Sequence, residues 1–136
     1  MLLCDAAQEI GGKLYVLGGG WSITGPAPVP HAVAVKIDVP WSEANRKHRF
    51  RLSLLTADGE PWMVGGPDGE QPLRMEGEFE TGRPPGLVEG ADLDFTFVAS
   101  IGPMELPSGQ RFEWRLWIDD VSEGDWSRAF STRRAT

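Results

Sequence analysis

The chain has 136 residues, of which 40% are hydrophobic and 24% are charged, and its formal net charge is −7 at pH 7. This composition predicts one folded domain over residues 1–136 and argues against a disordered chain. The acidic balance excludes nucleic acid as the main partner, and no stretch reaches the roughly 20 apolar residues of a membrane helix. The single cysteine, Cys4, cannot form an internal disulfide, and the start lacks the charged region of a signal peptide. We therefore expect a cytoplasmic protein with no membrane partner.

The N-terminal segment predicts two short strands separated by a Gly-Gly turn. The second strand runs into Gly18, Gly19 and Gly20, which are followed by Trp21. Because glycine adopts positive φ without a Cβ penalty, we expect this strand to leave its sheet, bend and cross to another layer. Asp5 stands among apolar residues of the first strand. It is expected either to face solvent or to be a buried structural anchor for the bend.

Five later segments alternate apolar and polar residues, which is typical of antiparallel strands with one buried face. They are residues 32–39, 49–54, 72–80, 93–101 and 111–119. Asp-Gly turn signals at 58–59 and 68–69 and the proline-rich segment 81–86 separate them. One or two helical turns are expected at 40–48, with Ser42 as the cap. We predict an all-β fold, an antiparallel β-sandwich of about 8–9 strands with at most one short helical turn.

Charge is distributed unevenly along the chain. Residues 36–51 are rich in bases, whereas residues 58–94 are rich in acids. Two hypotheses fit this pattern. The charges belong to solvated outer faces of strands, or they form a dipolar surface that orients a partner or a second copy.

No pattern in the sequence predicts catalysis, a cofactor or a metal site. The three glycines lack the lysine and the helix of a phosphate-binding loop. His31, His48 and Cys4 are too far apart in the sequence for the usual spacing of zinc ligands, and both histidines are expected at the surface. The acid pairs at 92/94 and 119/120 are interpreted as edge charges and turn residues. A catalytic acid or histidine in a cleft is the remaining, less favoured hypothesis.

Six tryptophans against one tyrosine are the strongest functional signal. Trp114 falls on the apolar face of its predicted strand, Trp117 falls on the opposite face, and the others lie at strand ends or in loops. An exposed tryptophan often marks an interface or a ligand platform, although each could instead be a lid over the core. The candidate interface residues are Trp21, Gly19, Gly20, Trp41, Trp62, Trp117 and Trp126.

Three segments together resemble a family of small uncharacterised bacterial all-β proteins. They are Asp5-Ala-Ala-Gln8, Gly12-Lys-Leu-Tyr-Val-Leu-Gly-Gly-Gly-Trp21, and the strand 106–119 with its Leu-Pro-x-Gly start. The resemblance implies a domain of unknown function, with no activity assigned. The strand 106–119 is more loosely similar to a late strand of immunoglobulin-like and C2-like sandwiches. It carries Phe112 where the immunoglobulin corner has tyrosine, and the chain lacks the cysteine pair.

We expect a non-catalytic cytoplasmic module for protein interaction or self-assembly. It would use the connection 18–30 with Trp21, and an aromatic patch that includes Trp117, to contact a protein partner or another copy. The alternative is a sandwich that binds a carbohydrate or a small apolar molecule on tryptophan platforms. A sandwich fold by itself favours neither function.

Overall fold

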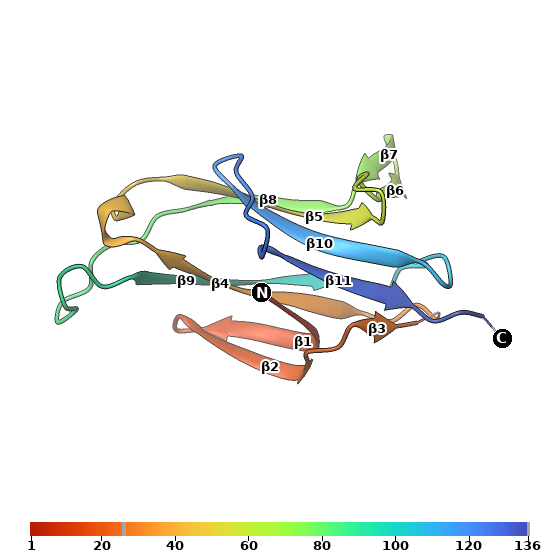
Figure 1. The fold of residues 1–136 in the computed structure, drawn as a ribbon, viewed down its shortest axis with the longest axis horizontal. Coiled ribbons are helices and arrows are strands. Elements are labelled where there is room, and N and C mark those ends of the chain that lie inside the picture. The colour runs from red at the N-terminus through yellow and green to blue at the C-terminus, as the bar shows by residue number, and fades with distance from the viewer. Residues whose placement is uncertain (26, 136) are drawn as a thin grey trace.

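The computed structural model describes residues 1–25 and 27–135. Residue 26 of the predicted connection 18–30 and residue 136 of the predicted domain therefore lie outside the described residues. The prediction of an all-β sandwich is confirmed, because two β-sheets are stacked on each other in the described residues (Figure 1).

The described residues form eleven strands, more than predicted, because β3, β6 and β7 are short and do not alternate. The strands are β1 (Leu2–Ile10), β2 (Lys13–Gly19), β3 (Ile23–Thr24), β4 (His31–Val39), β5 (His48–Thr56), β6 (Met63–Gly66), β7 (Gly69–Pro72), β8 (Arg74–Phe79), β9 (Leu93–Ile101), β10 (Arg111–Ile118) and β11 (Ser127–Thr132). One 3-10 turn, η1 (Trp41–Glu43), confirms the expected helical turn. The prediction that Ser42 caps it is wrong, since Pro40 holds the cap position without a side-chain hydrogen bond.

Two sheets enclose the main core. Sheet A has the order β2-β1-β4-β9, sheet B has the order β3-β11-β10-β5-β8, and β6 and β7 form a separate hairpin. The predicted inner faces are confirmed: Val33 and Val35 of β4 face Leu52 and Leu54 of β5 and Trp114 of β10 in one buried cluster. Each fully buried side chain of this size contributes roughly 1.5–3 kcal/mol to folding.

Stacked phenylalanines fill one end of the main core. The ring centroids of Phe79 and Phe95 lie 4.4 Å apart, and those of Phe50 and Phe97 also lie 4.4 Å apart. Gly77 leaves room for the Phe50 ring, because a Cβ on Gly77 would come within 2.7 Å of it. This position of β8 is therefore restricted to glycine by packing.

A buried histidine occupies the other end of the core, contrary to the prediction that His31 lies at the surface. The rings of Trp21 and Phe130 surround it, and the indole N–H of Trp114 donates a hydrogen bond to its Nε2 over 3.1 Å. Since Nε2 accepts, the imidazole is neutral with its proton on Nδ1. Burial lowers the pKa of His31, which keeps the ring neutral.

The β1–β2 hairpin leaves sheet A and covers its outer face. Cys4 pairs with Gly19 and Ala6 pairs with Leu17, but the ladder is interrupted between them at Gly18, whose φ is +60°. The start of β1 pairs with β4, whereas the rest of the hairpin turns beneath β4 and β9, on the side away from sheet B (Figure 1). Both β1 and β2 consequently contact β9, although neither is its neighbour in the sheet.

A second apolar cluster forms under this hairpin. Cys4, Ala32 and Ala34 are fully buried in it, and the partly buried residues packed against them are Ala7, Leu14, Val16 and Val98. Strand β4 is therefore buried on both faces, by the main core on one side and by the hairpin on the other. The predicted crossing after the three glycines is also confirmed, because the chain leaves β2 at Gly19 and enters sheet B at β3.

The bend at Gly18 gives a testable prediction. Gly18→Ala puts a Cβ on a residue with positive φ and against the Asp5 carboxylate, so we expect a loss of about 1–2 kcal/mol in the free energy of unfolding, measured with urea. Gly65→Ala is the matched control, since a Cβ there meets nothing within 4 Å. We expect it to change stability by less than about 0.5 kcal/mol. Equal losses for the two variants would contradict the assigned bend.

Candidate functional site

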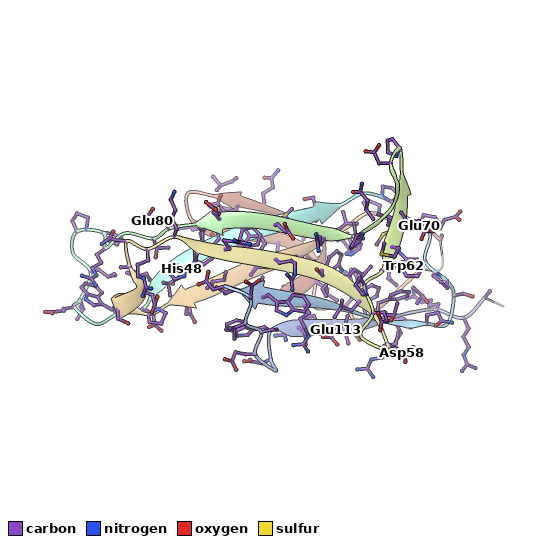
Figure 2. The ribbon with its side chains drawn as sticks, turned by 90° about the horizontal axis from the view of Figure 1, so that it is seen from above. His48, Asp58, Trp62, Glu70, Glu80 and Glu113 are labelled. Atoms are coloured by element: carbon purple, nitrogen blue, oxygen red, sulfur yellow. The ribbon has the colours of Figure 1, made fainter. Side chains whose placement is uncertain are left out.

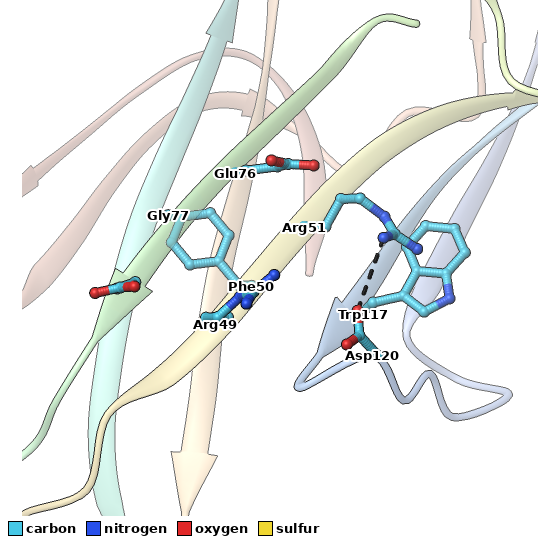
Figure 3. A pocket seen from close by; sticks show the side chains of 8 residues that line it. Arg49, Phe50, Arg51, Glu76, Gly77, Trp117 and Asp120 are labelled. Carbon is cyan, nitrogen blue, oxygen red and sulfur yellow. Dashed lines mark ion pairs between the residues drawn. The ribbon is translucent and has the colours of Figure 1, made fainter.

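A shallow pocket of about 310 Å³ lies on the outer face of sheet B, over β8, β5 and β10 (Figure 3). Arg51 stands at its centre, opposite Trp117 on β10 and Glu76 on β8. Its guanidinium carbon lies 4.6 Å from the centre of the Trp117 ring, and Nη1 lies 3.9 Å from the Asp120 carboxylate. Arg51 therefore covers one face of the Trp117 ring. The pocket presents charged groups and the edge of the indole to a ligand.

The pocket also shows where the uneven charges of the sequence meet. Arg49 pairs across the strands with Glu78, and Arg51 pairs with Glu76, so the base-rich segment lies directly beside the acid-rich one. Acids and bases alternate on this face. This arrangement favours the hypothesis of a solvated outer face over that of a dipolar surface.

His48 is the first residue of β5, and the prediction that it lies at the surface is wrong. Its ring is buried, and both ring nitrogens have partners: Nδ1 lies 2.7 Å from the Asp119 carboxylate and Nε2 lies 3.2 Å from the Glu43 carbonyl oxygen. The Asp119 hydrogen bond raises the pKa of His48, and the His48 contact in turn lowers the pKa of Asp119. The predicted turn at Asp119 and Asp120 is confirmed by their positive φ angles. The ion pair fastens the start of β5 to the turn after β10, and the Nε2 contact holds η1 against the same histidine.

The tryptophans do not gather on one surface. Four of them, Trp21, Trp41, Trp62 and Trp126, are half-buried against the main core, and Trp117 is half-buried on the outer face of sheet B. Trp62 packs edge-on against Phe112, toward the end of the molecule opposite His48 (Figure 2). A role for these residues at an interface stays a prediction.

Trp21 and Trp41 show how this partial burial arises. Trp21 covers His31 and Phe130, and its indole N–H lacks a hydrogen-bond partner among the described residues. Trp41 lies under the Arg83 guanidinium at 4.5 Å, and Arg83 also donates to the Trp41 carbonyl oxygen. Both indoles therefore act as lids over the sandwich.

The remaining predicted residues lie around the bend. Gly19 pairs with Cys4, and the Gly20 N–H donates to the Leu3 carbonyl oxygen over 2.8 Å. Asp5 is exposed, so the hypothesis that it is a buried anchor is wrong and the solvent-facing alternative is correct. Its carboxylate fills the space beside Gly18, where only a residue without a Cβ leaves room for it.

An apolar surface that the sequence analysis did not select lies on the solvent face of the hairpin. Leu17 is 72% exposed, Ile10 is 56% exposed and Tyr15 is 55% exposed. The register places them on one face, since Ala6 is opposite Leu17 and Ile10 is opposite Lys13. The sequence feature that could have revealed this surface is the continuous apolar run Leu14-Tyr-Val-Leu17, which makes both faces of β2 apolar.

Comparison with known proteins gives a family and no activity. Over residues 1–127 the chain matches the family of unknown function DUF6941. The chain belongs to this family. Membership confirms the resemblance to an uncharacterised all-β family. Comparison with curated proteins and with solved structures gave no match.

In this DUF6941 member, the described residues include no group of three or more His, Cys, Asp or Glu side chains placed to hold a metal ion. Nor does the part of the chain that the structure describes contain a helix long and apolar enough to cross a membrane.

The His48–Asp119 pair predicts a pH-dependent stability of the DUF6941 domain. Protonated His48 stabilises the fold fully below its unfolded pKa of 6.5, and this contribution is lost as the pH rises through its raised folded pKa. Ionised Asp119 stabilises the fold above its unfolded pKa of 3.8, and this stabilisation is lost as the pH falls through its lowered folded pKa. We therefore expect Asp119→Asn to destabilise the domain more at about pH 5.5 than at about pH 9.

Urea unfolding at the two pH values measures this difference. Asp120→Asn is the matched control, because Asp120 is exposed and lies 3.9 Å from Arg51. We expect the control to have a small effect that is similar at both pH values. An Asp119→Asn loss as large at about pH 9 as at about pH 5.5 would show that charge on His48 is not involved.

Proposed function

We propose that this chain is a non-catalytic interaction module that associates with a second copy of itself through the β1–β2 hairpin. The observation that supports this proposal is the apolar stripe of Ile10, Tyr15 and Leu17 on the solvent face of the hairpin. Contiguous exposed apolar side chains on a soluble domain typically mark an interface. The other face of the same hairpin is already packed on sheet A, so the stripe cannot turn inward.

The edge of β2 supports the same proposal. Within the described residues, β2 pairs with β1 only, which leaves the backbone groups of its other edge without a strand partner. A long apolar edge strand is a template for pairing with another chain unless something covers it. The proposed interface thus combines apolar side chains with main-chain hydrogen bonds.

Antiparallel pairing of two β2 strands about Val16 gives a closed two-fold interface. In that register Tyr15 of one copy lies opposite Leu17 of the other, twice over, so the two stripes join. Lys13 lies opposite Gly19 of the other copy, close to the exposed Asp5 beside Gly18. This charge complementarity between the hairpin tip and the bend favours a second copy over an unrelated partner.

We propose in addition that the module is cytoplasmic, and its buried free cysteine supports this proposal. Cys4 is a free thiol that is fully buried in the second cluster and donates a hydrogen bond to the Ala32 carbonyl oxygen. Burial raises the pKa of the Cys4 thiol, which keeps it unreactive. The fold therefore depends on apolar packing rather than on an oxidising compartment.

Light scattering coupled to size-exclusion chromatography tests self-association. We expect the wild-type chain to form a dimer and Leu17→Lys to be monomeric, because a charge would be desolvated at the interface. High salt is expected to leave the wild-type dimer intact, since apolar contacts and backbone hydrogen bonds are not screened.

Val88→Lys is the matched control, because Val88 is 77% exposed and lies outside the hairpin. We expect it to keep the oligomeric state of the wild type. A wild-type chain that stays monomeric at high concentration, or a dimer that Leu17→Lys leaves unchanged, would overturn the proposal.

A second candidate function is binding of a carbohydrate at the Arg51–Trp117 pocket. The pocket brings the edge of the Trp117 indole beside carboxylates and guanidinium groups, a combination that can contact a sugar ring and hydrogen-bond its hydroxyls. A glycan array followed by tryptophan fluorescence tests this candidate. We expect a fluorescence change that is lost in Trp117→Phe and kept in Trp41→Phe, and an array without a binder would remove the candidate.

A further inference from the structure

We infer that a groove along the free edge of β4 binds an extended segment of a partner protein, which adds to sheet A as a strand in line with β1. The groove has a volume of about 270 Å³, and it opens between the two sheets where β1 stops covering β4. Its occupant and its location both differ from those of the proposed self-association through β2.

The free edge follows from the register of sheet A. β1 pairs with β4 only along Leu2–Cys4, opposite Ala34, Val33 and Ala32. β9, in contrast, pairs with the whole of β4 as far as Val39. In the described residues, no turn or loop supplies a backbone hydrogen bond to residues 35–39. Since successive residues of an antiparallel strand point their N–H and C=O groups to alternate sides, part of this segment faces the groove unpaired.

In the opposite sheet, the pairing between β10 and β11 ends at the same place and a turn replaces the strand. The ladder between β11 and β10 covers Arg111–Arg115 and ends with Ser127 opposite Arg115. Beyond it, Leu116 and Ile118 line the groove together with Trp126. The Leu116 N–H donates to the Trp126 carbonyl oxygen, and the Ile118 N–H donates to that of Val121. The turn therefore borders the groove on the side of sheet B, and β4 provides the open strand edge.

The side chains around the groove define the segment that fits. Its apolar wall is formed by Ile37, Leu116, Ile118 and Trp126, so side chains that point inward must be apolar. Its mouth carries Lys36, Asp38 and Asp125, so side chains that point outward must be polar. Strand addition of this kind takes its affinity from main-chain hydrogen bonds and its specificity from alternate side chains.

Continuity with the existing ladder favours a strand over a compact ligand. The occupant would continue the position that Leu2–Cys4 already hold beside β4, with the same direction and the same alternation. A residue placed directly before Met1 would lie opposite Lys36, and the one before that would lie opposite Ile37 and point inward. The groove is therefore an extension of an established strand position.

A synthetic peptide, acetyl-Lys-Thr-Val-Thr-Val-Thr-Lys-amide, tests the inference on the full chain. Amide NMR is expected to show shifts and slowed hydrogen exchange at residues 36–39. The same peptide with proline for the central threonine is the control and is expected not to bind, because proline cannot continue a ladder. Equal binding of the two peptides, or shifts confined to other parts of the chain, would overturn the inference.

Two matched variants locate the binding. We expect Trp126→Ala to weaken peptide binding about tenfold and Trp117→Ala, which removes a half-buried tryptophan outside the groove, to leave it unchanged. Leu17→Lys is expected to bind the peptide as the wild type does. This last variant separates the groove from self-association, because it disables only the hairpin surface.

If the free peptide binds too weakly to measure, a strand covalently attached to the chain tests whether the groove accepts an added strand. The chain is extended before Met1 by alternating valine and threonine, with valine opposite Ile37 and Val39. We expect this extension to raise the Tm, and the same extension in the opposite phase to leave the Tm unchanged. An equal effect of the two phases, or none from either, would overturn the inference.

Discussion

Burial of β4 on both faces is the constraint on which the rest of the structure depends. Val33 and Val35 face the main core, whereas Ala32 and Ala34 lie under the β1–β2 hairpin. The two alanines are small enough for a second layer to approach closely, and the outer cluster adds apolar burial that a two-layer sandwich of this length would lack. The fold is therefore a sandwich with a third, partial layer.

The third layer is possible because the chain can turn at Gly18. A flat strand would place Leu3 and Ala7 on one face, yet Leu3 contacts the main core and Ala7 contacts the outer cluster. The interrupted ladder between Cys4 and Ala6 resolves this conflict. Once the hairpin has folded over, its own outer face and the edge of β2 become the new surface of that side of the molecule.

Unpaired strand edges unite the two interaction surfaces that we propose. β2 has an open edge because it is the last strand of the hairpin, and β4 has one because β1 covers only its first part. Exposed edges carry backbone donors and acceptors that favour pairing with another chain. We assign interaction to β2 because its free edge adjoins exposed apolar side chains, and to β4 because its free edge adjoins an apolar groove.

The tryptophans illustrate a limit of pattern analysis. Sequence position correctly placed Trp114 in the core and Trp117 on the opposite face of β10. It could not show that Trp21 and Trp62 lie on aromatic partners, because Phe130 and Phe112 come from strands far along the chain. The histidines were misjudged for the same reason: Trp114 buries His31, and Asp119 pairs with His48. Both contacts join segments that are remote in the sequence.

The sequence by itself determined the long alternating strands, their inward faces and the bend after the three glycines. These properties depend on side-chain alternation and on φ angles, which are local. Only the tertiary structure decided that the hairpin covers the outer face of sheet A, that acids and bases interleave on sheet B, and that β4 keeps an open edge. Each of these depends on which strands become neighbours, and that choice is made by packing between segments distant in the chain.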